Sequence, residues 1–526
     1  MCGIFAYIGN SIDHDRIKES FDQIKSRGPD HSALIKINNI HFGFHRLSIN
    51  DLSPLGNQPL SLDNLTLICN GEIYNYHQLK SEFNFQTSSQ SDCEIILHLY
   101  KHFNGDISKI VNNLDGEYSF IIHDSVNNEI YVARDPFGVR PLFFGSNDSG
   151  EYFFCSELKG LYKICDNVQQ FPSGAWLKYS NKELVKWFDK NFVVDNSIIL
   201  EQEIYPKIRD LFYKAVNKRL MSDRPVCCLL SGGLDSSLVA SIVAKQFPRG
   251  HIHTFSIGME DSPDLFYAKK VADFIGSTHH ELVLTEQEFL DAIPETIKVI
   301  ESYDTTTVRA SVGNYLISKY IAQTTDFKVV FNGDGSDEFG SYLYFGKAPT
   351  SVEFHKEANR LLDEIMYFDL LRSDRSISGN GLEARVPFLD IEFARYFASI
   401  PPIFKMHSRM EKYILRKAFE PESLLPREVL WRSKMAFSDG ISQKSKSWHT
   451  IINNYVDSII PNDIDNNFDH CKPVLKESYY YRTIFESIYG PQHSKVIPHF
   501  WLPRWCGNIV DPSARCLEES LDRPIN

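Results

Sequence analysis

Residues 226–237 of the chain, VCCLLSGGLDSS, join a short apolar run to a turn of glycines and serines. The run at 226–230 has the length and uniform hydrophobicity of a buried strand, and apolar residues repeat with helical spacing over residues 238–243. At such a turn consecutive backbone N–H groups can surround an anion, the helix N-terminus adds a favourable dipole, and Asp235 can hold a divalent cation. The stretch therefore predicts a phosphate site between a strand and a helix.

Strand and helix patterns continue to alternate after this turn. Further apolar runs lie at residues 252–257 and 328–331, and a helical pattern precedes the second of them. This rhythm is typical of a parallel sheet, whose ligands bind beyond the carboxyl ends of the strands. From residue 352 to about residue 490 the pattern is helical. We therefore expect a parallel-sheet α/β domain with a helical C-terminal part.

The first two hundred residues have a different pattern. Short strand-like runs, separated by Gly, Pro, Asn and Asp turns, occur with only two helical patterns, at residues 12–26 and 93–102. The mixture predicts an α+β domain built of layers. Residues 187–204 keep neither period and indicate a linker, so we place the boundary near Asn196, which gives domains at 2–196 and 197–526. The strand-like runs are 4–8, 32–37, 65–69, 118–122, 129–134 and 152–155.

Length and composition exclude several classes of protein. The 526 residues exceed what one hydrophobic core usually serves, and a net charge of −13 argues against a protein that coats nucleic acid or an anionic membrane. No stretch approaches the roughly 18 uncharged apolar residues of a spanning helix, and the start lacks the basic region of a signal peptide. Ten cysteines without a C-x-x-C pair fit reduced thiols. We expect a cytoplasmic enzyme with no nucleic-acid partner and no membrane partner.

Cys2 is the cysteine whose position is unusual. If Met1 is removed, Cys2 carries a thiol and a free α-amine, whose ordinary pKa of about 7.7–8.0 lets it accept the thiol proton near neutral pH. One residue then supplies both the nucleophile and its base. On position alone, a cysteine that simply packs against Ile4 explains the sequence equally well.

Polar motifs elsewhere in the N-terminal domain favour the chemical interpretation. Arg46 could pair with the α-carboxylate of a zwitterionic amino acid, and Glu72 and Asp92 with its α-ammonium. Asn70 and the backbone N–H of Gly71 could form an oxyanion hole for a tetrahedral intermediate. The motifs are RLSIN at 46–50, NGEIYN at 70–75 and SDCE at 91–94.

Together with CGI at 2–4, RGPD at 27–30, GNQP at 56–59 and RDPFG at 134–138, these motifs resemble the glutaminase domain of class II glutamine amidotransferases. The resemblance implies an αββα sandwich of the N-terminal-nucleophile (Ntn) hydrolase type. It also implies that Cys2 hydrolyses glutamine to glutamate and ammonia through a γ-glutamyl thioester, with Asn70 and Gly71 as further catalytic groups. The implied glutamine-binding residues are Arg46, Leu47, Ser48, Ile49, Asn50, Asn70, Gly71, Glu72 and Asp92.

The SGGLDSS loop has neither the G-K-[ST] of a Walker loop nor the G-x-G-x-x-G of dinucleotide binders, and it resembles the loop of ATP pyrophosphatases. With SYDTTTVRAS at 302–311, GDGSDE at 333–338 and EARVPFLD at 383–390, the chain resembles the glutamine-hydrolysing asparagine synthetases over nearly its full length. The resemblance implies that aspartate reacts with ATP to give β-aspartyl-AMP and diphosphate. Ammonia from the first site then displaces AMP and gives asparagine.

The same resemblance implies residue roles in the second domain. Lys412 would neutralise charge that develops on the α-phosphate, and Asp235 and Asp337 would bind Mg²⁺, the metal that accompanies the substrate ATP. Thr306, Thr307 and Arg309 would hold aspartate, with Arg309 on a carboxylate. The implied ATP-binding residues are Leu230, Ser231, Gly232, Gly233, Asp235, Ser236, Ile257, Asn332 and Gly333.

The chain departs from the family pattern at one loop. The family commonly reads SGEGSDE, whereas residues 332–338 read NGDGSDE and one residue is missing directly afterwards. Asp334 thus replaces a catalytic glutamate with a carboxylate one methylene shorter, and a misplacement of about 1 Å can cost on the order of 10²-fold in rate. Because the two changes lie together, a backbone shift could compensate. We expect activity, at an unchanged or reduced rate.

Three alternatives and one further motif remain. A related amide-forming, adenylating enzyme such as a β-lactam synthetase relative would not use glutamine, and a glutamine phosphoribosyl amidotransferase would not need the SGGLDSS loop. A catalytically weakened, nitrogen-responsive binding protein would not release diphosphate.

His279 and His280 are adjacent in a strand pattern, so they point to opposite faces and we interpret them as packing residues. The partners expected are glutamine, aspartate and ATP, and a homodimer is left open.

Overall fold

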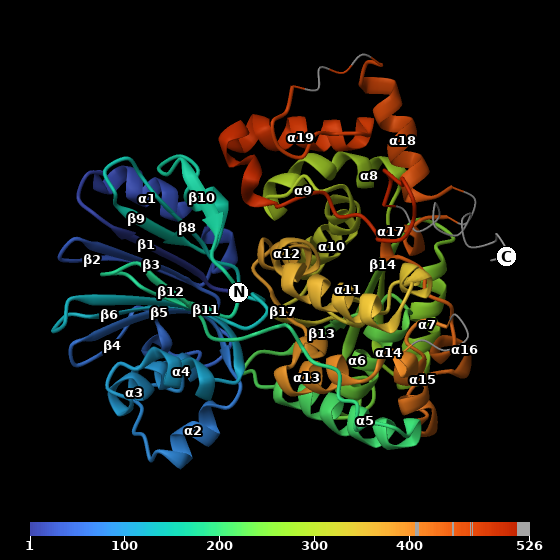
Figure 1. The fold of residues 1–526 in the computed structure, drawn as a ribbon, viewed down its shortest axis with the longest axis horizontal. Helices are drawn as coiled ribbons and strands as arrows, with labels where there is room; N and C mark the ends of the chain where they lie inside the picture. Colours follow the sequence, from blue (N-terminus) through green and yellow to red (C-terminus); the bar gives the residue numbers. More distant parts are fainter. Residues whose placement is uncertain (406–409, 444–445, 463, 465–466, 513–526) are drawn as a thin grey trace.

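The computed structural model describes residues 1–405, 410–443, 446–462, 464 and 467–512 (Figure 1). Residues 3–186 form two antiparallel sheets of six strands each, and we call this part the sandwich. The first sheet contains, in spatial order, β10 (Asn167–Gln170), β8 (Phe143–Ser146), β9 (Tyr152–Cys155), β1 (Gly3–Ile8), β3 (Ile40–Arg46) and β2 (His31–Ile37). The second contains β12 (Glu183–Lys186), β11 (Ala175–Lys178), β7 (Glu129–Arg134), β6 (Gly116–Asp124), β5 (Leu65–Ile73) and β4 (Leu60–Leu62).

Alternation along β1 explains how the layers pack. Ile4 and Ala6 belong to the core between the two sheets, whereas Phe5 and Tyr7 belong to the core beneath the outer helix, because successive side chains of a strand point to opposite faces. Figure 1 shows α1 outside the first sheet and α2 to α4 outside the second, which confirms the predicted αββα sandwich. The helices are α1 (His14–Asp22), α2 (Tyr76–Glu82), α3 (Ile95–His102) and α4 (Ile107–Asn113).

Several strands extend beyond their predicted ends. β5 continues through the polar residues Asn70 and Glu72 to Ile73, although the apolar run stops at Cys69. β3 was not predicted, even though Ile40, Phe42 and Phe44 alternate towards the core between the sheets. These strands are fixed by pairing with their neighbours, which local hydrophobicity does not reveal.

The chain after α5 (Glu201–Lys218) builds a second part around one parallel sheet. The predicted linker overlaps the start of α5, since residues 187–200 have no helix or strand and the helix begins at Glu201. The sheet has the order β15 (Thr278–Val283), β14 (His253–Gly258), β13 (Val226–Leu229), β16 (Val329–Phe331) and β17 (Glu383–Arg385), with every pair parallel. Chain order reverses direction between β13 and β16, and ligands of open α/β sheets bind at such a switch point.

β17 corrects the prediction of an uninterrupted helical pattern after residue 352. This strand is only three residues long, Glu-Ala-Arg, so it has neither the length nor the β-branched residues of a strand signal. Its pairing with β16 places it at the edge of the parallel sheet, on the side that faces the sandwich (Figure 1). The helices of this part after α5 are α6 (Leu234–Ala244), α7 (Pro263–Ile275), α8 (Glu286–Asp291), α9 (Ile293–Ile300), α10 (Thr305–Thr324), α11 (Ser351–Glu364), α12 (Asp369–Ser378), α13 (Ile391–Ser399), α14 (Pro402–Lys405), α15 (Tyr413–Phe419), α16 (Arg427–Leu430), α17 (Phe437–Gly440), α18 (Trp448–Ile459) and α19 (Lys476–Tyr489).

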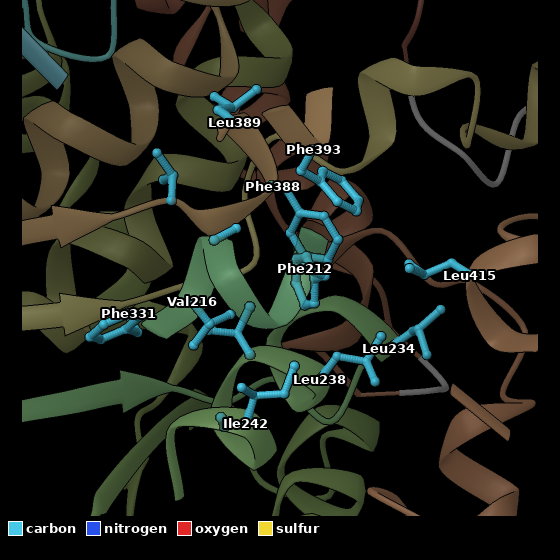
Figure 2. Packing of buried hydrophobic residues seen from close by; sticks show 14 of the residues in the cluster. Phe212, Val216, Leu234, Leu238, Ile242, Phe331, Phe388, Leu389, Phe393 and Leu415 are labelled. Atoms are coloured by element: carbon cyan, nitrogen blue, oxygen red, sulfur yellow. The ribbon is translucent and has the colours of Figure 1, made fainter. Parts of the chain in front are cut away.

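An apolar cluster fixes α6 against the sheet. Figure 2 shows Phe212 of α5 against Phe388 and Phe393, with Leu238 of α6 and Phe331 of β16 in the same cluster. The ring centroids of Phe212 and Phe388 are 4.4 Å apart, and those of Phe212 and Phe393 are 5.2 Å apart. Close packing of this kind tolerates little displacement. The cluster therefore sets where the N-terminus of α6 lies relative to the end of β16.

Buried arginines form ion pairs where the sandwich meets the parallel-sheet part. Arg27 of the sandwich lies 2.9 Å from Asp374 of α12, and Arg219 lies 2.9 Å from Glu117 of β6. Arg140 and Arg375 make further pairs across the same boundary. We call these four residues, together with Arg385 of β17, the interface arginines.

No helix among the described residues is long and apolar enough to cross a membrane.

Two candidate active sites

A cavity of about 280 Å³ lies beyond the carboxyl ends of β13, β14 and β16, at the switch point of the sheet. The predicted ATP-binding and aspartate-binding residues line it, apart from Gly232. Gly232 instead has a φ of +68°, and a Cβ there would come within 2.4 Å of the Ala268 backbone nitrogen on α7. The tight turn and the close approach to α7 explain why this position is a glycine.

The loop before α6 is built to receive an anion. No side chain in the described part of the chain caps the helix at Gly233, so no capping residue there satisfies its first N–H groups. Ser231 Oγ lies 3.0 Å from Ser236 Oγ, which closes the turn on itself. A Cβ on Gly333 would come within 2.6 Å of the Ser236 nitrogen, so only glycine lets the loop after β16 approach this closely. These contacts bring the ends of β13 and β16 together at the N-terminus of α6, where an anion is favoured.

Lys412 is the central charge of the cavity. It is buried, its Nζ donates to Asp235 and, at 3.0 Å, to Ser336 Oγ, and it lies 2.7 Å from Asp337. Burial opposes the charged form of Lys412, but Asp235 and Asp337 outweigh it and raise the pKa. Burial likewise acts to raise the pKa of Asp337, whereas Lys412 and Lys434 lower it and determine the net direction. Lys412 and Asp337 are therefore both charged near neutral pH.

The two aspartates have the chemistry of a magnesium site. Asp235 follows β13 and Asp337 follows β16, so the carboxylates converge from two strand ends. Asp235 Oδ1 is buried and has no hydrogen-bond partner among the described residues. A buried carboxylate oxygen without a partner suits a hard cation that takes oxygen ligands. No group of three or more His, Cys, Asp or Glu side chains in the described parts of the chain could hold a metal by itself, so water or phosphate oxygens would complete the shell.

The three predicted aspartate-binding residues differ in their present contacts. Thr306 Oγ1 is buried and has no partner among the described residues, so it is available to a ligand. Thr307 Oγ1 donates to Asp304 at 2.8 Å, at the N-cap of α10. Arg309 is held by two carboxylates, with its Nε 2.7 Å from Glu477 and its Nη1 2.9 Å from Asp511. No motif indicated these partners, which lie 168 and 202 residues further along the chain.

Asp334 is also held by a residue that sequence reasoning missed. Its Oδ1 accepts a hydrogen bond of 2.9 Å from Arg372, which also binds Asp369 at 3.0 Å. Burial opposes the charge on Arg372, but Asp334 and Asp369 raise its pKa. The shortened carboxylate is thus fixed in direction by an arginine of α12. Further lining residues that the motifs did not indicate are Tyr342, Arg432 and Lys434.

The second candidate site surrounds Cys2 at the start of β1. Cys2 Sγ lies 3.6 Å from the carbonyl oxygen of Leu47, and Arg27 Nε donates to the Cys2 carbonyl at 2.8 Å. With Met1 attached, the α-amino group belongs to Met1 and donates to the Leu382 carbonyl at 2.8 Å, and burial lowers its pKa to about 5. Burial raises the pKa of the Cys2 thiol to about 11, so the thiol is protonated in this form of the chain.

Asn70 gives the clearest indication of a ligand at this site. The residue is fully buried, and neither its Nδ2 nor its Oδ1 has a hydrogen-bond partner among the described residues. Leaving such an amide unpaired costs about 1–3 kcal/mol for each buried polar group, so a bound molecule is the expected partner. A Cβ at the adjacent Gly71 would come within 2.2 Å of the Glu117 carbonyl oxygen, which explains the glycine.

Two buried carboxylates lie beside Asn70. Asn50 Nδ2 donates to Glu72 and lies 3.5 Å from Asp92 Oδ1, and the Ile73 amide donates to Asp92 Oδ2 at 2.7 Å. Burial raises the pKa of Asp92 to about 6. Burial, reinforced by the charge of Asp92, raises the pKa of Glu72 well above its ordinary value. A cation such as an α-ammonium would relieve the repulsion between them.

The loop of residues 46–50 is held from both parts of the molecule. The terminal nitrogens of Arg46 donate to Asn57 Oδ1 at 2.7 Å and to the carbonyls of Ser53, Asn50 and Asp51. Leu47 and Ile49 are buried. The Ser48 amide donates to Asp30 at 2.8 Å, and the Ser48 carbonyl accepts from Arg224 of the parallel-sheet part at 3.0 Å. Arg46 therefore shapes this loop, and a ligand carboxylate would replace one of its present contacts.

His279 and His280 lie apart from both sites, on β15. His279 Nδ1 is 2.9 Å from Thr254 Oγ1, and His280 Nε2 is 2.9 Å from His253 Nδ1. Their partners lie on the neighbouring strand β14, in agreement with packing roles.

Family models match the two parts of the chain in turn. A glutamine amidotransferase domain matches residues 1–197, and an asparagine synthase model matches residues 207–359 and 347–505. The glutamine-hydrolysing asparagine synthetase of Gallus gallus is 43% identical and covers 98% of this chain and 99% of its own length. Those of Rattus norvegicus and Homo sapiens are each 42% identical, with 98% of both chains covered.

Proposed function

The chain belongs to the glutamine-hydrolysing asparagine synthetases, and we propose how its two sites divide the reaction. It makes asparagine from aspartate, glutamine and ATP. In the proposal, residues 2–196 form the domain that releases ammonia from glutamine, and residues 197–526 form the domain that uses ATP to activate aspartate. The convergence of Lys412, Asp235 and Asp337 on the N-terminus of α6 supports this division most directly.

At the first site, Cys2 attacks the side-chain carboxamide of glutamine. Removal of Met1 gives Cys2 the α-amine, which takes the thiol proton and later returns it to the departing ammonia. Asn70 Nδ2 and the Gly71 N–H stabilise the oxyanion, in keeping with the unpaired amide of Asn70. Water then hydrolyses the γ-glutamyl thioester to glutamate.

Glutamine is held at both ends of its backbone. Glu72 and Asp92 bind the α-ammonium, for which their mutual repulsion supplies a driving force. Arg46 binds the α-carboxylate in exchange for one of its carbonyl contacts, and Leu47, Ser48, Ile49 and Asn50 form the adjoining wall. This arrangement distinguishes an amino acid from a simple amide, because each charged end meets its opposite.

At the second site, the N–H groups before α6 hold the phosphates of ATP and Lys412 neutralises charge that develops on the α-phosphate. Asp235 and Asp337 would hold Mg²⁺, which supplies charge neutralisation to the phosphates when it is bound. Asp235 Oδ1 is the atom best placed for it, since it has no other partner among the described residues. Thr306 and Arg309 orient the aspartate carboxylates, so that the β-carboxylate meets the α-phosphate.

Adenylation solves a chemical problem. A free carboxylate would have to expel an oxide, whereas β-aspartyl-AMP expels AMP. The ammonia that displaces AMP is released in the sandwich. It crosses the boundary between the two parts of the molecule and reaches the cavity in the parallel-sheet part. Asp334, directed by Arg372, lies in the cavity at the position where the family places its catalytic glutamate.

Diphosphate release tests this assignment. We expect diphosphate to form only when ATP, aspartate and Mg²⁺ are all present, and asparagine to require a nitrogen donor in addition. Chelation of the metal should stop release, and added Mg²⁺ should restore it. Diphosphate formation without aspartate would contradict the assignment of Thr306 and Arg309, and its complete absence would favour a weakened binding protein.

Asp334→Glu tests whether the loop is tuned to the shorter side chain. Because Arg372 holds Asp334 at 2.9 Å, an added methylene pushes the carboxylate past its present position. We expect ammonia-dependent asparagine formation to fall about tenfold, since a misplacement of about 1 Å can cost up to on the order of 10²-fold. Asp334→Asn, which removes the charge and keeps the length, is the matched control. A strong rise in rate for Asp334→Glu would show that the aspartate is a handicap.

We further propose that the protein acts in the cytoplasm on these small molecules and without nucleic acid. The net charge of −13 supports this, as do the nine described cysteines, which are all free, whereas Cys516 lies outside the described residues. A homodimer stays a prediction, which light scattering of the purified chain would check.

A further inference from the structure

Arg385 connects the two sites, although no motif assigned it a role in either. The residue is fully buried on β17, the strand at the edge of the parallel sheet that faces the sandwich (Figure 1). Its Nη2 lies 3.7 Å from Oε1 of Glu72, a residue of β5 in the other part of the molecule. An arginine of the parallel-sheet part therefore lies close to a carboxylate of the proposed glutamine site in the sandwich.

The position of Arg385 is fixed on every side except the one that faces Glu72. In the parallel sheet its carbonyl accepts from the Asn332 amide at 3.1 Å. Its Nη1 donates to the carbonyls of Arg219 and Met221 at 2.9 and 3.1 Å, and its Nε donates to Glu383 at 2.5 Å. Nη2 alone among its nitrogens is buried without a hydrogen-bond partner in the described residues. The donor that remains is the one nearest Glu72.

The contact between Arg385 and Glu72 affects the charges of the glutamine site. Glu72 and Asp92 are both buried, and the charge of Asp92 disfavours ionisation of Glu72. Burial and Asp92 raise the pKa of Glu72, and the guanidinium of Arg385 is the largest opposing influence. Burial would lower the pKa of Arg385, but Glu383 and its other anionic neighbours raise it, so the guanidinium stays charged.

We propose that Arg385 is a positioning residue for glutamine, holding the Glu72 carboxylate where it receives the α-ammonium. The proposal rests on the glutamine-binding role proposed above for Glu72. The affinity for glutamine then depends on a residue of the parallel-sheet part. The ammonia-dependent reaction does not need the contact between Arg385 and Glu72. The carbonyl of the same residue binds Asn332 at the start of the loop that lines the cavity, so one short strand supports both sites.

The test compares glutamine-dependent with ammonia-dependent synthesis in Arg385→Met. We expect the KM for glutamine to rise about tenfold, because the guanidinium no longer stabilises the Glu72 carboxylate, while kcat and the KM for ammonia stay within about twofold. Arg385→Lys keeps the charge and should recover part of the affinity. Ammonia-dependent synthesis also reports whether each variant is folded.

Arg219→Met is the matched control, because Arg219 is another buried arginine that pairs across the same boundary with Glu117, in addition to its pair with Asp390 in its own part. We expect it to change both activities together. Equal losses of both activities in Arg385→Met would assign Arg385 a purely structural role and overturn the proposal. If Arg385→Met does not fold, an unchanged glutamine KM in Arg385→Lys overturns it instead.

Glu72→Gln separates this proposal from the function on which it rests. If Glu72 binds the α-ammonium, Glu72→Gln raises the glutamine KM, and adding Arg385→Met raises it little further, because the two changes remove one interaction. Effects that multiply independently would overturn the role of Arg385 alone. An unchanged glutamine KM in Glu72→Gln would overturn the glutamine site itself together with this proposal.

Discussion

Cys2→Ala is expected to abolish asparagine synthesis from glutamine and to leave synthesis from ammonia intact. Cys2 is the nucleophile proposed at the first site, and removing the nucleophile of such a site costs several orders of magnitude in rate. The cavity that holds Lys412 is built from β13, β14, β16 and α10 and has no contact with the Cys2 side chain among its lining residues. Aspartate activation should therefore continue, with free ammonia in place of the ammonia from glutamine.

Asparagine and glutamate would be measured separately with each nitrogen donor, at saturating ATP and aspartate. Cys165→Ala is a suitable control, since Cys165 is another buried thiol of the sandwich, whose Sγ donates to the Ser146 carbonyl at 3.3 Å. It should keep both activities. Loss of ammonia-dependent synthesis in Cys2→Ala would show that the two sites do not have separate roles.

Lys412→Met should give the opposite result, with no asparagine from either donor and continued hydrolysis of glutamine. The ammonium of Lys412 is the cation that joins Asp235 and Asp337, and methionine would leave these two carboxylates to repel each other and the phosphates. Loss of a preorganised charge of this kind costs about 10²–10³-fold in rate, and poorer ATP binding adds to it.

Diphosphate release and glutamate release would be followed in the same Lys412→Met sample. Lys405→Met is the control, because Lys405 is also a buried lysine of the parallel-sheet part, bound to the Ala398 carbonyl at 3.1 Å and not among the cavity residues. We expect it to retain diphosphate release. Normal diphosphate release by Lys412→Met would remove Lys412 from the reaction.

The strand, turn and helix around SGGLDSS were predictable because each follows from local sequence. The apolar run, the glycines and the helical spacing all lie within residues 226–243, and the structure places α6 directly after the loop. The αββα sandwich was inferred from resemblance to a known family. The predicted ends of its strands were less accurate than the predicted architecture. Asn70 and Glu72 extend β5 because they pair with β6, which hydrophobicity does not show.

What the sequence did not reveal depends on contacts between distant residues. Arg309 was predicted as a carboxylate-binding residue, but its partners Glu477 and Asp511 could not be identified without the fold. The ion pairs of Arg372 with Asp334 and of Arg385 with Glu72 could not be identified for the same reason. β17 was missed because a three-residue strand is defined by its neighbours rather than by its composition.

The comparisons also decide against two of the alternatives, the β-lactam synthetase relative and the glutamine phosphoribosyl amidotransferase. Relatives named as glutamine-hydrolysing asparagine synthetases match 98% of the chain, including both the glutaminase motifs and the SGGLDSS region. A β-lactam synthetase relative would not use glutamine, and a glutamine phosphoribosyl amidotransferase would not need the SGGLDSS loop.

The interface arginines determine how the two halves of the molecule can be oriented. Such pairs contribute little to the strength of association, because the charges lose hydration on burial, but leaving one buried charge unpaired costs about 3–5 kcal/mol. All five arginines pair with carboxylates in the same arrangement of the two parts. A rotated or shifted arrangement would break several of these pairs and would add this free-energy cost for each one. Halves joined by a linker ordinarily move as hinged bodies, whereas these are locked in one orientation. The distance that ammonia would cross between the two proposed sites is then expected to stay the same throughout turnover, because neither site can move relative to the other.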